Sequence, residues 1–333
     1  MRWVKMLPDE MYLERPDERS GEARSRGSLR IAVLLPCFNE AVAIGLVVES
    51  FRAALPGATI YVYDNNSQDE TREVARRAGA IVRTETRQGK GSVVRRMFAD
   101  VEADVYILAD GDGTYDAGAA PMLIQRLVED ELDFVNGARI STDENAYRRG
   151  HRFGNVLLSN LVRLIFGPLL KDMLSGYKVL SRRFVKSFPA LSHGFETETE
   201  IAVHALELRM PCAELETVYR ERPAGSASKL RTYRDGMRIL VLIARLVKNE
   251  RPILFFGLLG LASCLLGVGL GIPIVTEYLR TGLVPRVPTA ILSTGLVLVG
   301  VISFFSGLIL GTVTQARQEL KRLIYLSLPR LGQ

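Results

Sequence analysis

Two aspartates follow a short apolar run near the middle of the chain and could hold a metal ion. Residues 105–109 are rich in strand formers and predict a buried strand, after which come Asp110, Gly111, Asp112 and Gly113. Alternate residues of an extended segment point to opposite sides, but the intervening glycine lets the backbone turn, so both carboxylates can reach one ion. Such oxygen ligands suit Mg²⁺ or Mn²⁺, which also bind substrate phosphates. A strand that simply ends in an Asp/Gly turn is the alternative.

Alternating strand and helix patterns place these aspartates at one edge of an α/β sheet. Strands are predicted at 31–35 (stopped by Pro36), 59–63, 80–83, 105–109 and 133–136, and helices at 42–54, 69–78, 92–101 and 121–129. Strands that alternate with helices form a parallel, right-handed sheet, and ligands bind outside the carboxyl ends of its strands. Three polar segments follow such strands: 36–40, 64–67 and 110–112.

The C-terminal third is far more apolar than the rest of the chain. Residues 253–275 and 289–313 contain no charged side chain, and each run exceeds the ~20 residues that a helix needs to cross a bilayer core. Arginine and lysine gather before the first run and after the second, whereas the connector 276–288 carries only three charged residues. Positive charge marks the cytoplasmic side, so both flanks are expected in the cytoplasm and the connector outside. A buried helical hairpin of a soluble domain is the alternative.

These patterns divide the chain into five parts. Residues 1–29 form a charged tail without the apolar core of a signal peptide, and residues 30–230 hold the α/β pattern. Residues 231–251 predict a basic amphipathic helix that lies on the membrane, with its cations near anionic lipid head groups. Residues 252–314 hold the two spans, and residues 315–333 form a cytoplasmic tail.

Charge and cysteine content exclude some classes of function. The chain has 333 residues and a net charge of +6, which would fit nucleic-acid binding, but its basic residues gather beside the apolar runs. A membrane-surface role therefore explains the charge without nucleic acid. The three cysteines lack metal-type spacing, so neither a zinc site nor a disulfide framework is predicted.

Glycines recur within the two apolar runs. The spacings Gly267-x-x-x-Gly271 and Gly307-x-x-x-Gly311 would let two helices approach closely, within one chain or between copies in a homo-oligomer. This spacing is also frequent by chance in apolar runs, so it carries little weight by itself.

An ordered set of motifs resembles the family 2 glycosyltransferases with the GT-A fold. The set comprises Pro36-Cys-Phe-Asn-Glu40, Asp64-Asn-Asn-Ser-Gln-Asp-Glu-Thr71, Gly89-Lys-Gly91, Asp110-Gly-Asp112, Asp172-Met-Leu-Ser-Gly-Tyr-Lys178, Gly194-Phe-Glu-Thr-Glu-Thr-Glu200 and Arg222-Pro-Ala-Gly-Ser-Ala-Ser-Lys-Leu230. With two apolar runs behind them, these motifs resemble the polyprenyl-phosphate glycosyltransferases, which include dolichol-phosphate mannose synthase and bacterial glucosyl-carrier synthases. The resemblance covers about residues 30–322. It implies a GT-A catalytic domain at 30–230, followed by a hairpin of two transmembrane helices.

The resemblance also implies a reaction. A hexose would pass with inversion from a nucleotide-sugar to a polyprenyl phosphate, giving a lipid-linked monosaccharide for a cell-envelope glycan. A UDP-hexose is the favoured donor, from a loose similarity of residues 110–116 to users of UDP-sugars, and GDP-mannose is the alternative. Asp110 and Asp112 would bind Mg²⁺ or Mn²⁺, whereas Thr114 stands at a third-ligand position of relatives. Residues expected to contact the nucleotide-sugar are Pro36, Asn39, Glu40, Asp64, Asn66, Lys90 and Asp110.

Phosphate ligands for the acceptor are expected between the sheet and the first apolar run, because the lipid cannot leave the bilayer cheaply. The candidates carry cationic or hydroxyl groups: Arg139, Arg149, Arg152, Arg222, Ser228 and Lys229. Any one of these arginines is equally well explained as a solvated surface residue. The candidate catalytic residues are Asp112, Asp172, Glu198 and Arg139. Either Asp172 or Glu198 would orient sugar hydroxyls or act as a base. A lipid phosphate is already an anion, so catalysis would rest on positioning and on stabilising the leaving diphosphate.

Two other functions stay open for such a chain. A processive polysaccharide synthase would share the domain, but those enzymes carry a Gln-x-x-Arg-Trp motif, and the single tryptophan here is Trp3. The second is an inactive membrane-bound binder of sugar nucleotides, against which the presence of Asp64, Asp110 and Asp112 together argues. We therefore expect an enzyme of the inner membrane with a cytoplasmic catalytic domain.

Overall fold

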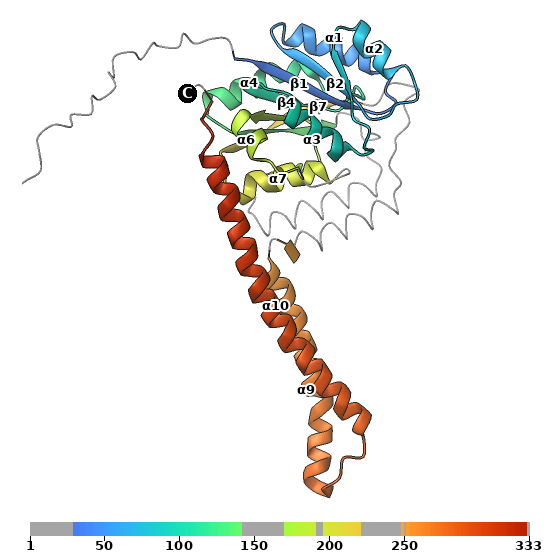
Figure 1. The fold of residues 1–333 in the computed structure, drawn as a ribbon, viewed down its shortest axis with the longest axis vertical. Coiled ribbons are helices and arrows are strands. Elements are labelled where there is room, and N and C mark those ends of the chain that lie inside the picture. The colour runs from blue at the N-terminus through green and yellow to red at the C-terminus, as the bar shows by residue number, and fades with distance from the viewer. Residues whose placement is uncertain (1–28, 142–169, 191–195, 221–247, 250, 332–333) are drawn as a thin grey trace, which may run out of the picture.

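A computed structural model describes residues 29–141, 170–190, 196–220, 248–249 and 251–331. These residues form an α/β domain from which two long helices extend (Figure 1). The N-terminal tail, most of the predicted amphipathic helix 231–251 and the last two residues lie outside the described residues.

The domain is built on a seven-stranded sheet with the order β3-β2-β1-β4-β6-β5-β7. Its strands are β1 (Ile31–Cys37), β2 (Thr59–Asp64), β3 (Ile81–Thr84), β4 (Val105–Leu108), β5 (Phe134–Ser141), β6 (Lys178–Ser181) and β7 (Cys212–Tyr219). The predicted parallel pairing is confirmed for β1 with β2 and β4, and for β2 with β3. β6 runs antiparallel to both β4 and β5, so the sheet is mixed. β6 and β7 were not predicted from the sequence.

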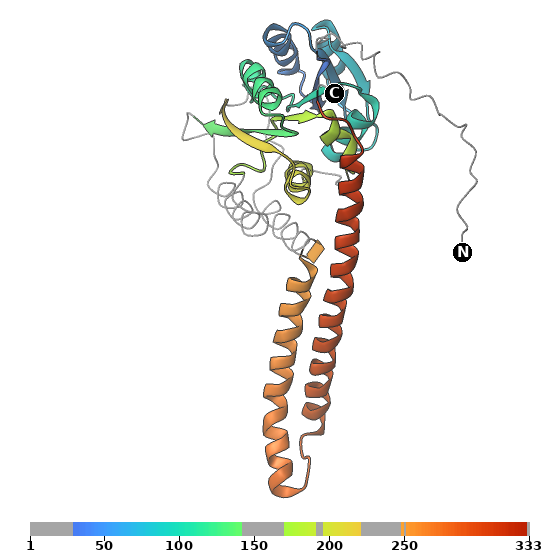
Figure 2. The same cartoon turned by 90° about the vertical axis from the view of Figure 1, so that its left-hand side faces the viewer.

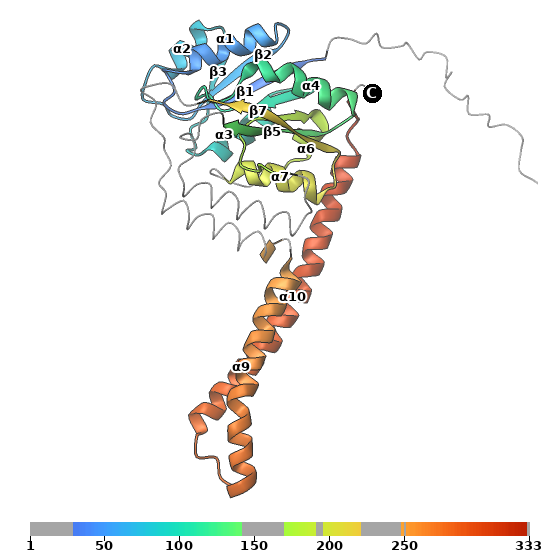
Figure 3. The same cartoon turned by 180° about the vertical axis from the view of Figure 1, so that it is seen from behind.

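Helices cover both faces of the sheet (Figures 1 and 3). They are α1 (Ile44–Ala54), α2 (Thr71–Arg77), α3 (Lys90–Asp100), the short 3₁₀ helix η1 (Ala117–Ala119), α4 (Ala120–Glu129), α6 (Arg182–Ser187) and α7 (Thr197–Glu207). One apolar core contains residues of α1, α2 and α4, and the other contains residues of α3, α6 and α7. All four residues of β4 are buried, because both faces of this central strand are covered.

The prediction that Pro36 stops the first strand was wrong. β1 continues to Cys37, and Pro36 stays in register with Tyr63 of β2. The carbonyl oxygen of Leu34 accepts a hydrogen bond from the backbone nitrogen of Ala109. The backbone N–H and C=O groups of Leu34, and of every second residue after it, therefore point toward β4. Pairing with β4 ends at Leu34, and the missing N–H of Pro36 therefore interrupts no ladder.

Two long helices, α9 (Pro252–Thr281) and α10 (Val287–Leu326), contain the predicted spans and lie side by side (Figure 2). In each helix only 11% of the most apolar 18-residue window is buried. A core helix of a soluble protein would be mostly buried, so the exposure disfavours that alternative. By length and composition both helices could cross a membrane, and they are the candidate spans among the described residues.

A seam of glycines joins α9 to α10. A Cβ atom added at Gly260 would lie 2.7 Å from the carbonyl oxygen of Gly300, and one at Gly267 would lie 2.9 Å from that of Ser293. The Ser293 hydroxyl donates a 2.7 Å hydrogen bond to the Gly267 carbonyl. The seven-residue spacing of these contacts is typical of a left-handed helix pair. The glycines of the predicted G-x-x-x-G motifs also face the partner helix, where added Cβ atoms would contact it: Gly267, Gly271, Gly307 and Gly311.

Candidate active site

The loops after β1 and β2 are bound to each other at the carboxyl edge of the sheet. The backbone nitrogen of Asn39 donates to the Ser67 hydroxyl at 2.8 Å, and Asn39 Oδ1 accepts from the backbone nitrogen of Gln68 at 2.8 Å. Asp64 is fully buried, and its two oxygens accept from the backbone nitrogen of Ser67 at 3.3 and 3.2 Å. Glu40 is also buried. The predicted nucleotide ligands of these loops therefore come together, while Asp64 also holds a turn.

Asn65, which sequence reasoning missed, holds the next loop in place. Its side-chain nitrogen donates to the carbonyl groups of Glu85 and Arg87, both at 2.8 Å, and its oxygen accepts from the backbone nitrogen of Gly89 at 2.7 Å. Asn66, with a φ of 66°, binds the same loop through a 2.8 Å hydrogen bond to the carbonyl of Thr86. These bonds fix the start of α3 beside the strand ends. The signal in the sequence was the pair of adjacent asparagines directly after a strand.

Lys90, at the start of α3, is shared by two carboxylates. Its ammonium group forms ion pairs with Asp110 and with Glu198, and only 12% of the Lys90 side chain is exposed. Burial alone would lower the pKa of Lys90, but the two carboxylates outweigh it and raise that pKa. Oε2 of Glu198 is buried and accepts no hydrogen bond from the described residues. A buried acceptor of this kind is costly to leave without a donor.

Asp112 is buried beside this group and is oriented by Thr114. Its Oδ1 accepts from the backbone nitrogen of Thr114 at 3.1 Å and from the Thr114 hydroxyl at 2.7 Å. Thr114 therefore positions a predicted metal ligand. Two glycines pack closely around the aspartates. A Cβ atom added at Gly111 would lie 2.4 Å from Cys37 Sγ, and one added at Gly176 would lie 2.6 Å from Asp110 Oδ2.

The donor set fits a divalent cation that also binds substrate. Among the described residues no group of three or more His, Cys, Asp or Glu side chains could hold a metal by itself. Mg²⁺ is commonly bound by one or two carboxylates together with the phosphates of a substrate, and it keeps several waters. Asp110 and Asp112 supply two such carboxylates, which agrees with this kind of site and not with a structural metal site.

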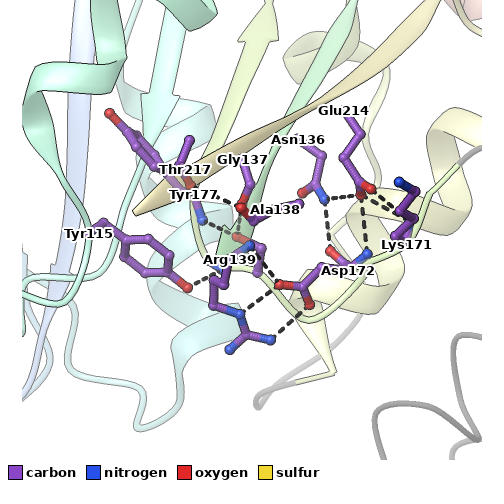
Figure 4. Close-up of polar contacts among 12 residues, drawn as sticks. Tyr115, Asn136, Gly137, Ala138, Arg139, Lys171, Asp172, Tyr177, Glu214 and Thr217 are labelled. Atoms are coloured by element: carbon purple, nitrogen blue, oxygen red, sulfur yellow. Dashed lines mark hydrogen bonds and ion pairs between the residues drawn. The ribbon is translucent and has the colours of Figure 1, made fainter. Parts of the chain in front are cut away.

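A second polar cluster lies around Arg139 and Asp172 (Figure 4). Arg139 Nε donates to Asp172 Oδ2 at 2.7 Å, Nη2 donates to Oδ1 at 2.8 Å, and the backbone nitrogen of Arg139 donates to Oδ2 at 3.1 Å. Burial alone would raise the pKa of Asp172, but the hydrogen bonds and charge of Arg139 lower it below its ordinary value. An ionised carboxylate with both oxygens engaged is suited to orienting Arg139, and it is poorly suited to act as a base.

Glu214 and Asn136 hold the backbone around Asp172 through hydrogen bonds. Sequence reasoning missed both residues. Glu214 Oε1 and Oε2 accept from the backbone nitrogen of Lys171 at 2.9 and 3.1 Å, and Oε2 accepts from that of Asp172 at 3.2 Å. The Asn136 amide donates to Glu214 Oε2 at 2.8 Å and to the Asp172 carbonyl at 2.7 Å. Figure 4 shows both side chains on the far side of Asp172 from Arg139. Only the polar Asn136, directly after the apolar residues Phe134 and Val135, could have indicated the network.

The turn from Asp172 to Gly176 joins the two clusters. Its first residue binds Arg139, and its last residue packs against Asp110. The backbone nitrogen of Gly176 donates to the Tyr115 hydroxyl at 2.6 Å, which fixes the turn between the clusters (Figure 4). The sequence motif that begins at Asp172 therefore reaches both sides of the candidate site.

Lys178 follows this turn and is completely buried. Its ammonium group donates a 3.0 Å hydrogen bond to Asn136 Oδ1 and lies 5.4 Å from the ring centre of Phe134. Burial lowers the pKa of Lys178 to about 8, although the charges of Glu198 and Asp172 act in the opposite direction. This lysine was quoted only as the end of a motif and was not predicted as a site residue.

Five predicted acceptor ligands lie outside the described residues: Arg149, Arg152, Arg222, Ser228 and Lys229. Their roles stay predictions. Of the predicted acceptor set, Arg139 is the member that the structure describes, and it lies at the same end of the sheet as the turn that reaches Asp110.

Comparison with known proteins agrees with this arrangement. Residues 32–188 match the profile of Glycosyl transferase family 2. Glycosyltransferase AglJ of Haloferax volcanii is 32% identical over 296 residues, which cover 88% of this chain and 97% of that protein. The dolichyl-phosphate hexose transferase of the same organism is 29% identical over 227 residues, 66% of this chain and 95% of that protein.

A solved structure is similar to the α/β domain. Glucosyl-3-phosphoglycerate synthase of Mycobacterium tuberculosis, in complex with Mn²⁺, uridine diphosphate and glucosyl-3-phosphoglycerate, aligns with a TM-score of 0.54 and 22% identity. The alignment covers 67% of this chain and 80% of that one. At this identity the likeness establishes the fold, and it confirms the predicted GT-A architecture.

Proposed function

The chain belongs to glycosyl transferase family 2 and is a glycosyltransferase, and on that premise we propose that it transfers a hexose from UDP-hexose to a polyprenyl phosphate. The observation that carries the acceptor class is that two helices of spanning length, with exposed apolar surfaces, follow the catalytic domain. The name of the dolichyl-phosphate hexose transferase relative supports the same class of acceptor. We also propose that the helices cross the membrane and leave the catalytic domain in the cytoplasm.

The donor would bind at the carboxyl ends of β1, β2 and β4. Glu40, Asp64 and Asn66 lie at the loops that would hold the nucleoside. Asn39 shapes the first of these loops, and Pro36 lies near the end of β1, just before it. Asp110 and Asp112 would hold Mg²⁺ or Mn²⁺, which when bound would neutralise charge on the diphosphate. The solved relative with Mn²⁺ and uridine diphosphate supports this choice of metal and nucleotide. Oε2 of Glu198 would accept a hydrogen bond from a sugar hydroxyl.

The acceptor phosphate would bind beside Arg139. A guanidinium carries five N–H donors, and the side chain of Asp172 accepts from Nε and Nη2. This bidentate pair fixes the plane of the guanidinium before any substrate arrives, which limits the entropy lost on phosphate binding. Arginine at this position would also offset repulsion between the acceptor phosphate and the donor diphosphate.

The reaction needs little proton transfer. An oxygen of the lipid phosphate would form the new bond to the anomeric carbon, and the bond from that carbon to the diphosphate would break with inversion. The attacking oxygen is anionic at neutral pH, so no side chain has to remove a proton from it. The engaged carboxylate of Asp172 agrees with such a mechanism. Lys90 would remain charged at neutral pH and stabilise negative charge on the donor side.

Reconstitution tests the proposal directly. The full chain is placed in lipid nanodiscs with polyprenyl phosphate, Mg²⁺ or Mn²⁺, and labelled UDP-glucose, UDP-N-acetylglucosamine or GDP-mannose. Lipid-linked monosaccharide is expected from a UDP-hexose and is expected to disappear when EDTA removes the metal. Product from GDP-mannose alone would overturn the donor assignment. Transfer to a polysaccharide with none to the lipid phosphate would overturn the acceptor assignment.

A further inference from the structure

The last three turns of α10 leave α9 and contact the α/β domain (Figures 1 and 2). The Thr314 hydroxyl donates a 3.1 Å hydrogen bond to the carbonyl of Asn249, just before the start of α9. Beyond this level α10 continues to Leu326. Lys321 and Tyr325 are four residues apart, so they lie on one face of the helix. Both side chains reach the domain.

Tyr325 completes a buried cluster around Asp133. Its hydroxyl donates to Asp133 Oδ2 at 2.5 Å, and the guanidinium carbon of Arg183 lies 4.2 Å from the centre of its ring. Asp133 also accepts from Arg183 and, at 2.6 Å, from the Ser181 hydroxyl. Only 7% of Tyr325 and 2% of Asp133 are exposed. A buried carboxylate bonded in this way is costly to leave with a missing partner, so the contact is specific.

Lys321 makes the second contact, to the last residue of α7. Its ammonium group lies 2.7 Å from Glu207 Oε2, and the side chains of Lys321 and Glu207 are 17% and 1% exposed. Removing the lysine would leave a buried carboxylate without its cation. The end of α10 is therefore held at two points by buried charge.

These two points lie on the elements that carry the candidate site. Asp133 immediately precedes β5, whose residues include Arg139. Glu207 ends α7, whose first turn carries Glu198. The helix α10 thus contacts β5 and α7, which carry Arg139 and Glu198, at the ends of these elements that lie away from the candidate site.

We propose that the docked end of α10 is a strut that sets the height and tilt of the catalytic site over the bilayer, so that Arg139 meets the phosphate of a membrane-embedded acceptor. The inference rests on the proposed function. From Thr314 to Tyr325 the helix rises roughly 16 Å, and a straight helix of three turns is stiff. A lipid phosphate is confined to the membrane surface, so a rigid link of fixed length would determine whether the site can reach it.

The test compares one pair of substitutions with a matched pair of exposed residues on the same turns. Lys321→Ala combined with Tyr325→Ala removes both contacts. Arg322→Ala combined with Ile324→Ala removes a cation and a large side chain that are exposed on the same turns. Each chain, in nanodiscs, is assayed with a long-chain polyprenyl phosphate and with a short, water-soluble prenyl phosphate. Affinity for the sugar nucleotide is measured alongside.

The variant with Lys321→Ala and Tyr325→Ala, called the undocked pair, is expected to lose at least tenfold in kcat/KM for the long-chain acceptor. Its kcat/KM for the soluble acceptor and its nucleotide affinity are expected to stay within twofold of the wild type. The control pair is expected to match the wild type on both acceptors. Equal loss on both acceptors would mean that the contacts only maintain the fold, and no loss on either would mean that they do not position the site; either result overturns the proposal.

A second readout does not depend on activity. A dye on Glu49→Cys, in a chain whose native cysteines are replaced by alanine, reports its distance from a dye at the nanodisc surface by energy transfer. Wild type and control are expected to give one narrow distance distribution, and the undocked pair a broad one. Identical distributions would overturn the strut. Failure of the wild type to glycosylate either prenyl phosphate would instead reject the proposed function, and the distance measurement would still decide the strut.

Discussion

The two polar clusters of the candidate site contain similar residues but differ in the ratio of carboxylates to cations. Around Lys90, one cation faces the carboxylates of Asp110 and Glu198, and Asp112 lies beside them. Around Arg139, one cation meets the carboxylate of Asp172 in a bidentate pair. The first cluster is therefore negative overall, whereas the second is balanced.

This difference indicates which ligand each cluster can accept. An excess of buried carboxylate favours a bound cation and hydroxyl donors, as a metal–sugar-nucleotide complex would supply. A guanidinium whose plane is fixed by a carboxylate favours an anion over a cation, because it presents N–H donors in a fixed geometry that matches the oxygens of a phosphate. The comparison therefore predicts that substitutions in the first cluster affect the metal and donor, and that substitutions in the second affect the acceptor.

The largest effect is expected from Asp112→Ala, which removes a predicted metal ligand from the negative cluster. Loss of metal stabilisation of the leaving diphosphate should cost several kcal/mol and lower kcat by on the order of a thousandfold. The measurement is transfer to polyprenyl phosphate over a range of Mg²⁺ and Mn²⁺ concentrations, with folding checked by thermal unfolding.

The matched control for this change is Asp116→Asn in the same loop. Asp116 accepts a 3.3 Å hydrogen bond from the backbone nitrogen of Gly118 and caps a short helix. Asparagine caps a helix as well as aspartate, so the substitution removes only the charge that faces the exposed Arg220 at 3.3 Å, outside the Lys90–Asp110–Asp112 cluster, and should change kcat by no more than about threefold. Near-normal activity of Asp112→Ala with an unchanged metal requirement would remove Asp112 from the metal site.

A smaller effect, on the other substrate, is expected from Arg139→Ala. Losing a hydrogen bond to a charged group costs roughly 1.5–3 kcal/mol, so kcat/KM for the lipid phosphate should fall tenfold to a hundredfold. Affinity for the sugar nucleotide, measured without acceptor, should stay unchanged. Arg139→Lys should recover only part of the loss, because an ammonium group cannot pair bidentately with Asp172. Lost nucleotide affinity with intact acceptor affinity would reverse the assignment of the two clusters.

The sequence grouped the residues of the proposed donor side better than those of the proposed acceptor side. The rule that ligands bind at strand ends was sufficient to group four residues, because each lies at or after the end of a strand: Asp64, Lys90, Asp110 and Asp112. Asp172 and Arg139 pair across 33 residues, and Glu214 reaches them from a strand that pairing with β5 brings close. Spacing along the chain contains no information about such long-range pairs.

The next effect should come from Glu214→Gln, which acts on the acceptor cluster through Asp172. An amide nitrogen cannot accept the hydrogen bonds of Lys171 and Asp172, so the turn that holds Arg139 should loosen. We expect a loss of about tenfold in kcat/KM for the lipid phosphate, equivalent to about 1.4 kcal/mol. Glu216→Gln, two residues along the same face of β7 and exposed, is the control and should match the wild type. Equal values for the two variants would show that Glu214 does not position the pair.

The fold was predictable where local patterns determine it. Strands β1 to β5 and helices α1 to α4 were predicted to within a few residues at most ends, because alternating apolar runs specify them. The strand β6 was missed because it is only four residues long and contains the buried Lys178, which a pattern of apolar residues excludes. The wrong end of β1 at Pro36 depended on where pairing with β4 stops, which is a property of the sheet and not of the local sequence.

The smallest effect tests Lys178, the buried cation whose pKa responds to a carboxylate from each cluster. Its pKa is lowered from 10.5 to about 8 by burial, while Glu198 and Asp172 act to raise it. Between pH 8 and 10.5 the unfolded chain therefore binds more protons at this residue than the folded chain does, so folding gains stability as pH rises through that window. Below pH 8 both states are protonated and Lys178 adds no pH dependence. Relative to Lys178→Met, the wild type should gain about 0.8 kcal/mol by pH 8.5.

Thermal unfolding of the wild type and the Lys178→Met variant, each from pH 7 to 9.5, measures this gain, because all other titrating groups are common to both chains. The difference in Tm should be flat below pH 8 and then shift in favour of the wild type by a few degrees. Adding Asp172→Asn to both chains removes one carboxylate that raises the pKa of Lys178, so the rise should begin at lower pH. A Tm difference that does not vary with pH would mean that Lys178 keeps an ordinary pKa and that the charges of the two clusters do not act on it.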